Sequence, residues 1–132
     1  MKIVAAANVF LAIALNEPEK AEIIRITKGI SLIAPRTLPF ELGNALSAML
    51  KRRTLYAENM MPIWDALQKI PVELRDVDIR MALKLASRFN IYAYDAYVLE
   101  CAASFKCPLL TLDRRLSTVA HSHDIHVLEV SQ

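Results

Sequence analysis

The stretch Pro108–Arg115, with the sequence PLLTLDRR, decides the fold of this chain of 132 residues. Its residues Leu109 to Leu112 are apolar or β-branched, a pattern that predicts a short buried strand. Asp113 follows where this strand is expected to end, and in open α/β sheets functional sites form just beyond the carboxyl ends of the strands. The simpler interpretation is that Asp113 caps a following helix over Arg114–Ala120.

The composition indicates one domain with a substantial core. The hydrophobic content is 55%, and only 2 glycines favour many helices and few tight hairpins. The net charge of +2 neither requires nor excludes a nucleic acid as partner. Cys101 and Cys107 form no disulfide framework, which favours a reducing cytoplasm. Asn8 interrupts the apolar segment Ile3–Leu15, and no charge-free stretch approaches the ~20 residues of a spanning helix, so we expect a cytoplasmic protein without a membrane span.

Apolar runs and helical periodicity alternate along the chain. Five short strands are predicted, over Lys2–Ala5, Ser31–Ala34, Pro71–Leu74, Leu109–Leu112 and Ile125–Val130. Seven helices are predicted, over Asn8–Leu15, from Glu17 to a cap at Gly29, from a cap at Thr37 to Arg52, and over Ala57–Ile70, Val77–Phe89, Tyr94–Phe105 and Arg114–Ala120. Strands that alternate with helices in this rhythm indicate an α/β sandwich around a mainly parallel sheet.

The third and fourth predicted helices form a helical hairpin that carries Met49, Met60, Met61 and Trp64. Such residues are most often core, but a hairpin that projects from a small sheet has more apolar surface than the core can cover. Met-rich surface suits a partner helix or a second copy of the chain, so the hairpin is a candidate contact for either. Gly43, inside the first of these helices, suggests the close approach of another backbone.

Three acidic residues stand in apolar surroundings. Glu41 lies in the first turns of an amphipathic helix, Asp95 lies within the sequence IYAYDAYVL, and Asp113 ends the buried strand. A carboxylate in such a setting is unfavourable unless it is paired or bound to a cation. Each has a simpler interpretation, since Asp95 and Asp113 could cap helices and Glu41 could be a first-turn acid favoured by the helix dipole. The coincidence of all three favours a shared site.

Clustered carboxylates without cysteine or histidine are typical of sites for Mg²⁺ or Mn²⁺, which prefer oxygen ligands and keep several waters. Such ions hold a phosphodiester, lower the pKa of a bound water and stabilise the leaving oxygen. Asn8 and Thr111 could support the ligands through hydrogen bonds. Arg114 and Arg115 could contact an RNA backbone, with a solvated helix start as the alternative.

Two other sets of polar residues have simpler interpretations. The run Lys51–Arg53 ends a helix, where cations favour the helix dipole, so a solvated helix end is the preferred interpretation over contact with RNA. His121, His123 and His126 cross from a helix end into a strand with no cysteine beside them. Their spacing is no zinc signature, so a histidine metal site is disfavoured.

Four pieces of the sequence resemble the PIN-domain proteins of the VapC toxin type. They are IVAAANVF at the start, PFELGNAL around Glu41, YDAY around Asp95 and LLTLD around Asp113, and together they span nearly the whole length. The resemblance implies a three-layer α/β/α sandwich and a small Mg²⁺- or Mn²⁺-dependent ribonuclease, usually homodimeric and held inactive by a cognate, VapB-like antitoxin. It matches Glu41, Asp95 and Asp113 to the family's acids, Asn8 to the polar residue after the first strand, and Thr111 to the hydroxyl residue before the last acid.

The chain departs from the family pattern at Ala6. The family's first acid ends the first strand, two residues before the position of Asn8, and a methyl group there cannot bind a cation. We interpret Ala6 as the replacement of an aspartate, either engineered so that an active toxin can be expressed or inherited in a degenerate member. We therefore expect weak or absent metal binding and little cleavage by this chain. The alternative function is a PIN-like module that binds RNA or a protein without cleaving it.

Overall fold

The computed structural model describes residues 1–130 of the protein. Within them the strands form one sheet, in which all neighbours are parallel and the order is β3-β2-β1-β4-β5. The strands are β1 (Lys2–Ala5), β2 (Ser31–Pro35), β3 (Glu73–Arg75), β4 (Leu109–Leu110) and β5 (Val127–Leu128). The predicted parallel sheet of five short strands is confirmed.

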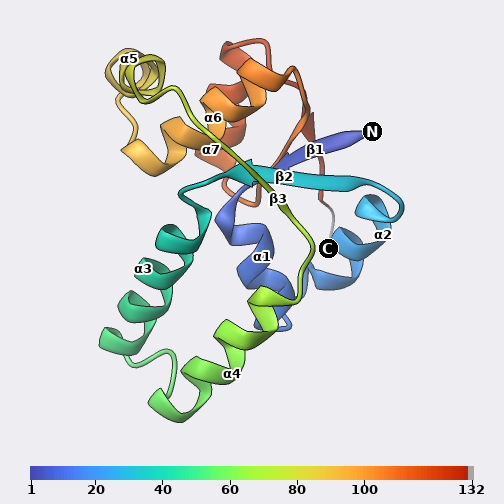
Figure 1. Ribbon diagram of the computed structural model, residues 1–132, viewed down its shortest axis with the longest axis vertical. Coiled ribbons are helices and arrows are strands. Elements are labelled where there is room, and N and C mark those ends of the chain that lie inside the picture. The colour runs from blue at the N-terminus through green and yellow to red at the C-terminus, as the bar shows by residue number, and fades with distance from the viewer. Residues whose placement is uncertain (131–132) are drawn as a thin grey trace.

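Seven helices connect and cover these strands in the described part of the chain (Figure 1). They are α1 (Ala7–Ala14), α2 (Lys20–Thr27), α3 (Leu38–Lys51), α4 (Ala57–Gln68), α5 (Ile79–Phe89), α6 (Ala93–Phe105) and α7 (Arg114–Ser122). In residues 1–130, no helix combines the length and the apolar character that a membrane span requires. Figure 1 shows α5, α6 and α7 on one side of the sheet and α1, α3 and α4 on the other, so the predicted three-layer sandwich is confirmed.

The sheet divides the apolar core in two, because successive side chains of a strand point to opposite faces. Ile3 and Ala5 of β1 belong to the core that packs against α1 to α4. Val4 and the following Ala6 belong to the core that packs against α5, α6 and α7. All four are buried. β1 is therefore covered on both faces, as is usual for a central parallel strand.

Three predicted strands are shorter in the structure. The strand expected over Pro71–Leu74 is reduced to β3, which has three residues and begins at Glu73. The strands expected over Leu109–Leu112 and Ile125–Val130 are reduced to β4 and β5, with two residues each. Beyond β4 the backbone leaves the ladder, because the N–H of Leu112 donates to the side chain of Asn8 at 3.0 Å. The apolar pattern continues past the last strand hydrogen bond, and the pattern alone therefore overestimates the strand.

The helix ends differ in part from the prediction. Gly29 follows α2 with a φ of +75°, as predicted for a cap. α2 itself begins at Lys20, so Pro18 lies before its first turn. Thr37 precedes α3, but its side chain makes no capping hydrogen bond. Its backbone is already helical, at φ −75° and ψ −9°, whereas a capping residue typically has an extended backbone.

The predicted hairpin of α3 and α4 is present, but the two helices diverge from the loop that joins them (Figure 1). An apolar hollow of about 380 Å³ lies there, lined by Gly43, Leu46, Ser47, Met60, Met61 and Trp64. The predicted close backbone approach at Gly43 is wrong within the described chain, because a Cβ on this residue would meet nothing within 4 Å beyond its chain neighbours and the backbone of its own helix. The hairpin thus keeps apolar surface exposed, including 57% of Met61.

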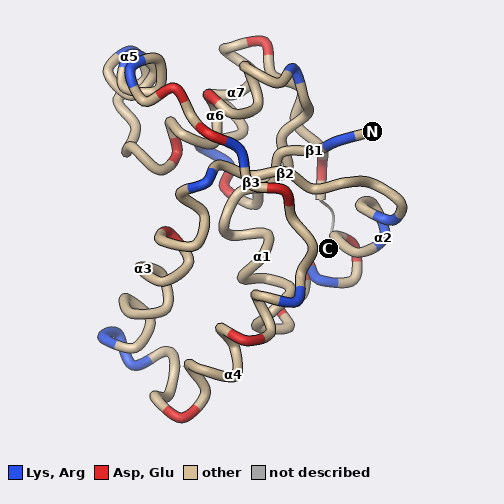
Figure 2. Tube along the Cα trace, viewed as in Figure 1, with Lys and Arg blue, Asp and Glu red and all other residues tan. Residues whose placement is uncertain are grey.

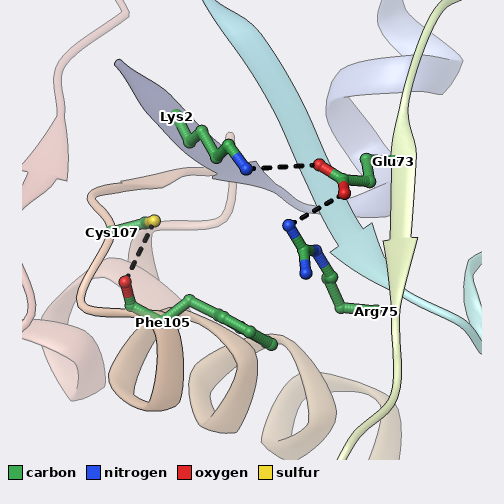
Figure 3. A network of polar contacts seen from close by, with 5 residues as sticks. All are labelled: Lys2, Glu73, Arg75, Phe105 and Cys107. Carbon is green, nitrogen blue, oxygen red and sulfur yellow. Dashed lines mark hydrogen bonds and ion pairs between the residues drawn. The ribbon is translucent and has the colours of Figure 1, made fainter.

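A polar network fastens the edge strand β3 to the rest of the domain (Figure 3). One carboxylate oxygen of Glu73 pairs with Arg75 Nη2 at 2.8 Å, and the other pairs with Lys2 Nζ of β1 at 3.5 Å. The Arg75 guanidinium lies over the ring of Phe105 at the end of α6, 5.1 Å from the ring centre. Cys107 Sγ donates to the carbonyl of Phe105 at 3.3 Å. Side chains therefore supplement the short ladder between β3 and β2.

Replacing Lys106 with glycine is expected to raise the free energy of unfolding by about 0.5–1 kcal/mol. Lys106 ends α6 with a φ of +53°. This left-handed conformation is unfavourable for a residue with a Cβ and accessible to glycine. Urea unfolding of the two proteins measures the difference.

Lys28→Gly is the matched control, because Lys28 follows α2 with a φ of −59°. Glycine relieves no strain there and adds freedom to the unfolded chain, so this variant is expected to be less stable by up to about 1 kcal/mol. A gain of stability in both variants would contradict the argument.

Candidate active site

The carboxyl ends of β1 and β4 meet at the switch point of the sheet. From β1 the chain continues through β2 and β3 on one side, while β4 and β5 lie on the other. In open α/β sheets the ligand-binding crevice lies at such a point. Ala6 follows β1, and its N–H donates to the carbonyl of Leu110 at the end of β4, at 3.0 Å. Thr111 and Asp113 follow β4, so three of the predicted site residues share this edge.

Asn8 joins the turn after β1 to the loop after β4. Its Nδ2 donates to Thr111 Oγ1 at 3.1 Å, and its Oδ1 accepts from the N–H of Leu112 at 3.0 Å. Thr111 Oγ1 also accepts from the N–H of Asp113 at 3.2 Å. Thr111 is 5% exposed. The two residues predicted to support the site therefore hold the backbone from which Asp113 projects.

Asp113 is the N-cap of α7, which confirms the simpler interpretation of this residue. Its Oδ1 accepts from the N–H groups of Arg115 at 2.9 Å and Leu116 at 3.2 Å. The cap fixes the direction of the carboxylate, and the residue as a whole remains exposed. An aspartate that caps a helix with one oxygen can still present the other to a ligand, so the two interpretations are compatible.

Asp95 is the third residue of α6 and is half-buried. It is no cap, because Tyr92 occupies the N-cap position. Burial raises the pKa of Asp95, the charge of Asp113 raises it further, and the guanidinium of Arg115 opposes both. Arg115 is held nearby, since its Nη2 donates to the carbonyl of Asn90 at 2.9 Å.

Glu41 lies in the first turn of α3 and is half-buried. Burial, and secondarily the charge of Asp95, raise the pKa of Glu41 from 4.5 to about 7. Glu41 thus interacts with Asp95, and Asp95 with Asp113. The structure brings the three acids, which come from α3, α6 and the start of α7, into one chain of mutually repelling carboxylates.

The carboxylates do not form a compact metal cluster. Within residues 1–130, no three His, Cys, Asp or Glu side chains are arranged so that they could hold one metal ion together. The donor set still suits a hard cation, because Mg²⁺ commonly uses one or two protein carboxylates and fills its other positions with water or phosphate oxygens. The pairs Glu41 with Asp95 and Asp95 with Asp113 offer such sets.

Ala6 occupies a buried position at this edge. It is the N-cap of α1, it is 4% exposed, and no side chain caps that helix. Its methyl group belongs to the core that includes Ala96, the residue after Asp95. An acidic side chain here would point to the face of the sheet on which α6 carries Asp95.

The basic and histidine residues are distributed more widely. Arg114 is exposed and lines a groove that begins at Thr111 and Leu112. The run 51–53 lies at the outer tip of the hairpin (Figure 2) and is exposed, as expected for a helix end. His121 lines the same groove as Arg114, whereas His123 and His126 line a hollow at the start of β4.

Sequence reasoning missed Asn90, whose carbonyl positions Arg115. Asn90 ends α5 with a φ of +53°, a conformation that asparagine tolerates better than most residues. An asparagine after a helix could therefore have indicated the cap. Its contact with an arginine 25 positions later could not have been read from the local pattern.

Solved structures with the same fold include three proteins of low sequence identity. VapBC2 from Rickettsia felis, bound to a DNA fragment from their promoter, superposes with a TM-score of 0.71 at 12% identity, over 99% of this chain and 100% of that one. PAE2754 from Pyrobaculum aerophilum superposes with a TM-score of 0.67 at 22% identity, over 90% of this chain and 79% of that one. FitAcB from Neisseria gonorrhoeae superposes with a TM-score of 0.62 at 14% identity, over 96% of each chain. No curated protein matches the sequence.

The fold and the site define a class: a parallel three-layer α/β domain with carboxylates at the switch point of its sheet. The family model described as the PIN domain matches residues 3–122. The chain therefore belongs to the PIN domain family, and the family resemblance noted from the sequence is confirmed.

Replacing Glu41 with glutamine is expected to remove part of the pH dependence of stability. The folded protein binds a proton at Glu41 up to about pH 7, whereas the unfolded chain releases it near 4.5. The stabilisation is therefore complete below pH 4.5 and is lost as the pH rises towards 7. After allowance for solvent screening we expect about 1–3 kcal/mol between pH 4.5 and 8.

Urea unfolding at several pH values measures this difference for the wild-type chain and for Glu41→Gln. Glu58→Gln is the matched control, because Glu58 lies in the first turn of α4 and is exposed. The control is expected to follow the wild-type curve. A Glu41→Gln variant with an unchanged slope would show that Glu41 lies in an ordinary aqueous environment.

Proposed function

We propose that the protein is a metal-dependent endoribonuclease of the VapC type, the toxin component of a toxin–antitoxin pair, weakened by Ala6. The observation that carries the proposal is the chain of interacting carboxylates Glu41, Asp95 and Asp113 at the switch point beyond β1 and β4. Acids that repel one another, of which Glu41 and Asp95 are half-buried, are unfavourable for a folded protein unless a cation or a proton joins them. A cytoplasmic location, where such a toxin would meet RNA, belongs to the same proposal.

Asp95, paired with Asp113 or with Glu41, would hold Mg²⁺ or Mn²⁺, and the ion would supply a Lewis acid for phosphodiester hydrolysis. The remaining roles fall to residues of the chain itself. Asn8 and Thr111 fix the backbone of Asp113. Arg115 offsets the charge of Asp95 and would draw an anionic phosphate towards the carboxylates.

Ala6 supports a weakened activity. An aspartate at this buried position would add a fourth carboxylate to the edge where Ala6 meets Leu110. Its absence removes one ligand and one negative charge, and both reduce the affinity for a divalent cation. The same observation favours the second candidate function, a PIN-like module that binds RNA or a protein partner without cleaving it.

An antitoxin and a second copy of the chain complete the proposal. The apolar hollow between α3 and α4, with Met60, Met61 and Trp64, suits an amphipathic helix of a VapB-like partner. The likeness of the fold to VapBC2 and FitAcB supports this assignment. For the homodimer we propose α5, where Ile79 and Leu83 are four residues apart and 52% and 53% exposed.

Ala6→Asp is expected to cut RNA in Mg²⁺ at a rate at least about a hundredfold above the chain with Ala6, because it restores a carboxylate at the metal edge. The added Asp95→Asn substitution is expected to abolish this cleavage. The added Asp65→Asn substitution is the control, because Asp65 is exposed on α4 and the structure gives it no part in the site. Cleavage is followed on gels with purified transfer and ribosomal RNA, with and without EDTA.

Mn²⁺ titration by calorimetry accompanies the cleavage assay. Ala6→Asp is expected to bind the ion more tightly than the unsubstituted chain. Equal affinity would refute the assignment of position 6. If no RNA is cut by Ala6→Asp, the non-cleaving module becomes the better account.

Leu83→Glu is expected to convert a homodimer into monomers, because it places a charge in the apolar side of α5. Met61→Glu is the matched control and is expected to leave the dimer intact. Light scattering at several protein concentrations measures the mass. If only Met61→Glu dissociates the dimer, the two copies contact each other through the hairpin of α3 and α4 and not through α5.

A further inference from the structure

A polar groove of about 480 Å³ lies beside the candidate active site, along the outer side of α7. Thr111 and Leu112, the residues before Asp113, line the end nearest to the carboxylates. The carboxyl end of β5 contributes Glu129, and the approach to α2 contributes Glu19. The wall formed by the helix consists of Arg114, Ser117, Thr118 and His121. We call this hollow the α7 groove.

The residues of α7 form one continuous row in the groove because they are spaced by three or four positions, which is the spacing of one helix face. Arg114 and His121 are seven positions apart, which corresponds to about 10 Å along a helix axis. A stacked single strand advances about 3.4 Å for each nucleotide. The row therefore spans about three nucleotides of a strand that leaves the carboxylates past Thr111.

The two hydroxyl groups of the row present only acceptors to the groove. Ser117 Oγ donates its hydrogen to the carbonyl of Asp113 at 3.1 Å, and Thr118 Oγ1 donates to the carbonyl of Arg114 at 3.0 Å. A hydroxyl has one donor and two acceptor lone pairs. Once the hydrogen is bound to the helix backbone, the oxygen can bind only a ligand that is itself a donor.

The groove therefore combines two kinds of recognition. The guanidinium of Arg114 and the ring of His121 can donate to phosphate oxygens. The oxygens of Ser117 and Thr118 and the carboxylate of Glu129 require donors. A phosphate offers no donor, and neither does a deoxyribose in the strand. A ribose offers its 2′-hydroxyl, which is both donor and acceptor.

We propose that the α7 groove holds the ribonucleotides next to the scissile phosphodiester, and that Ser117 and Thr118 accept hydrogen bonds from ribose 2′-hydroxyl groups. These two residues then select RNA over DNA, while Arg114 holds the backbone of either. This inference rests on the proposed nuclease function for the position of the scissile bond. Amino groups of the bases are the competing donors, but they occur in both nucleic acids and give no preference for ribose.

Fluorescence anisotropy with short labelled single strands of one mixed sequence tests the proposal. The strand is prepared as RNA, as DNA and as the 2′-fluoro analogue, whose fluorine cannot donate. The full chain is used in EDTA, so that metal-dependent cleavage plays no part. RNA is expected to bind about tenfold more tightly than the other two strands. This difference corresponds to one or two hydrogen bonds from ribose 2′-hydroxyl groups.

Three variants separate the roles of the groove residues. Ser117→Ala/Thr118→Val is expected to lower the affinity for RNA to that for DNA and to leave the affinity for DNA unchanged. Arg114→Ala is expected to weaken the binding of RNA and of DNA to a similar extent. It is also expected to reduce the salt dependence of the affinity by the amount that corresponds to about one phosphate contact. Ser122→Ala is the matched control, because Ser122 is also on α7 and its Oγ donates to the carbonyl of Thr118, yet it does not line the groove.

Equal binding of RNA and DNA by the unsubstituted chain, or no binding of either, would overturn the proposal. So would a double variant that keeps the preference for RNA, or a loss of the preference in Ser122→Ala. Thermal unfolding of each variant shows whether the helix is intact, and Thr118→Val alone, with half of the effect, replaces the double variant if that one unfolds. Because binding is measured without metal, a failure here is distinct from a failure of Ala6→Asp to cut RNA.

Discussion

The hydrogen bonds of the Asn8 amide are the interaction on which the site depends. They join two loops that are more than a hundred residues apart in the chain, one after β1 and one after β4. The amide binds the hydroxyl of Thr111, and that hydroxyl binds the N–H of Asp113. The direction of Asp113 and the start of α7 both follow from this arrangement. Without it the N–H of Leu112 would lose its acceptor, and Thr111 Oγ1 would keep only the N–H of Asp113 as a donor.

The electrostatic character of the site follows from where the sheet places its acids. Elements on both faces of the sheet send a carboxylate to the same edge, so Glu41 from α3 meets Asp95 from α6. Arg115 offsets part of the repulsion at Asp95. At Glu41, burial and the charge of Asp95 both raise the pKa of the carboxyl, to about 7, so that protonation relieves part of the repulsion. The methyl group of Ala6 limits the repulsion at the place where a further carboxylate would increase it.

The sequence predicted the elements and the edge of the site because both depend on local patterns. Apolar runs mark the five strands. Asp113 follows β4 in the sequence, so it lies at the carboxyl end of that strand whatever the position of β4 in the sheet. Strand lengths were overestimated, because the length of a strand depends on where the hydrogen bonds to its neighbouring strand end. The divergence of α3 from α4 and the open space at Gly43 depend on packing between elements, which no local pattern encodes. The contact of Arg115 with Asn90 was missed for the same reason.

The two edges of the sheet are formed by β3, with three residues, and β5, with two. A strand from another chain can be added only where a row of unpaired backbone groups is long enough to guide it. The edge strands β3 and β5 offer too few unpaired backbone groups to form a ladder with a strand of another chain. Any partner of this domain would therefore bind to helix surfaces, where the shape and charge of side chains decide which partner fits.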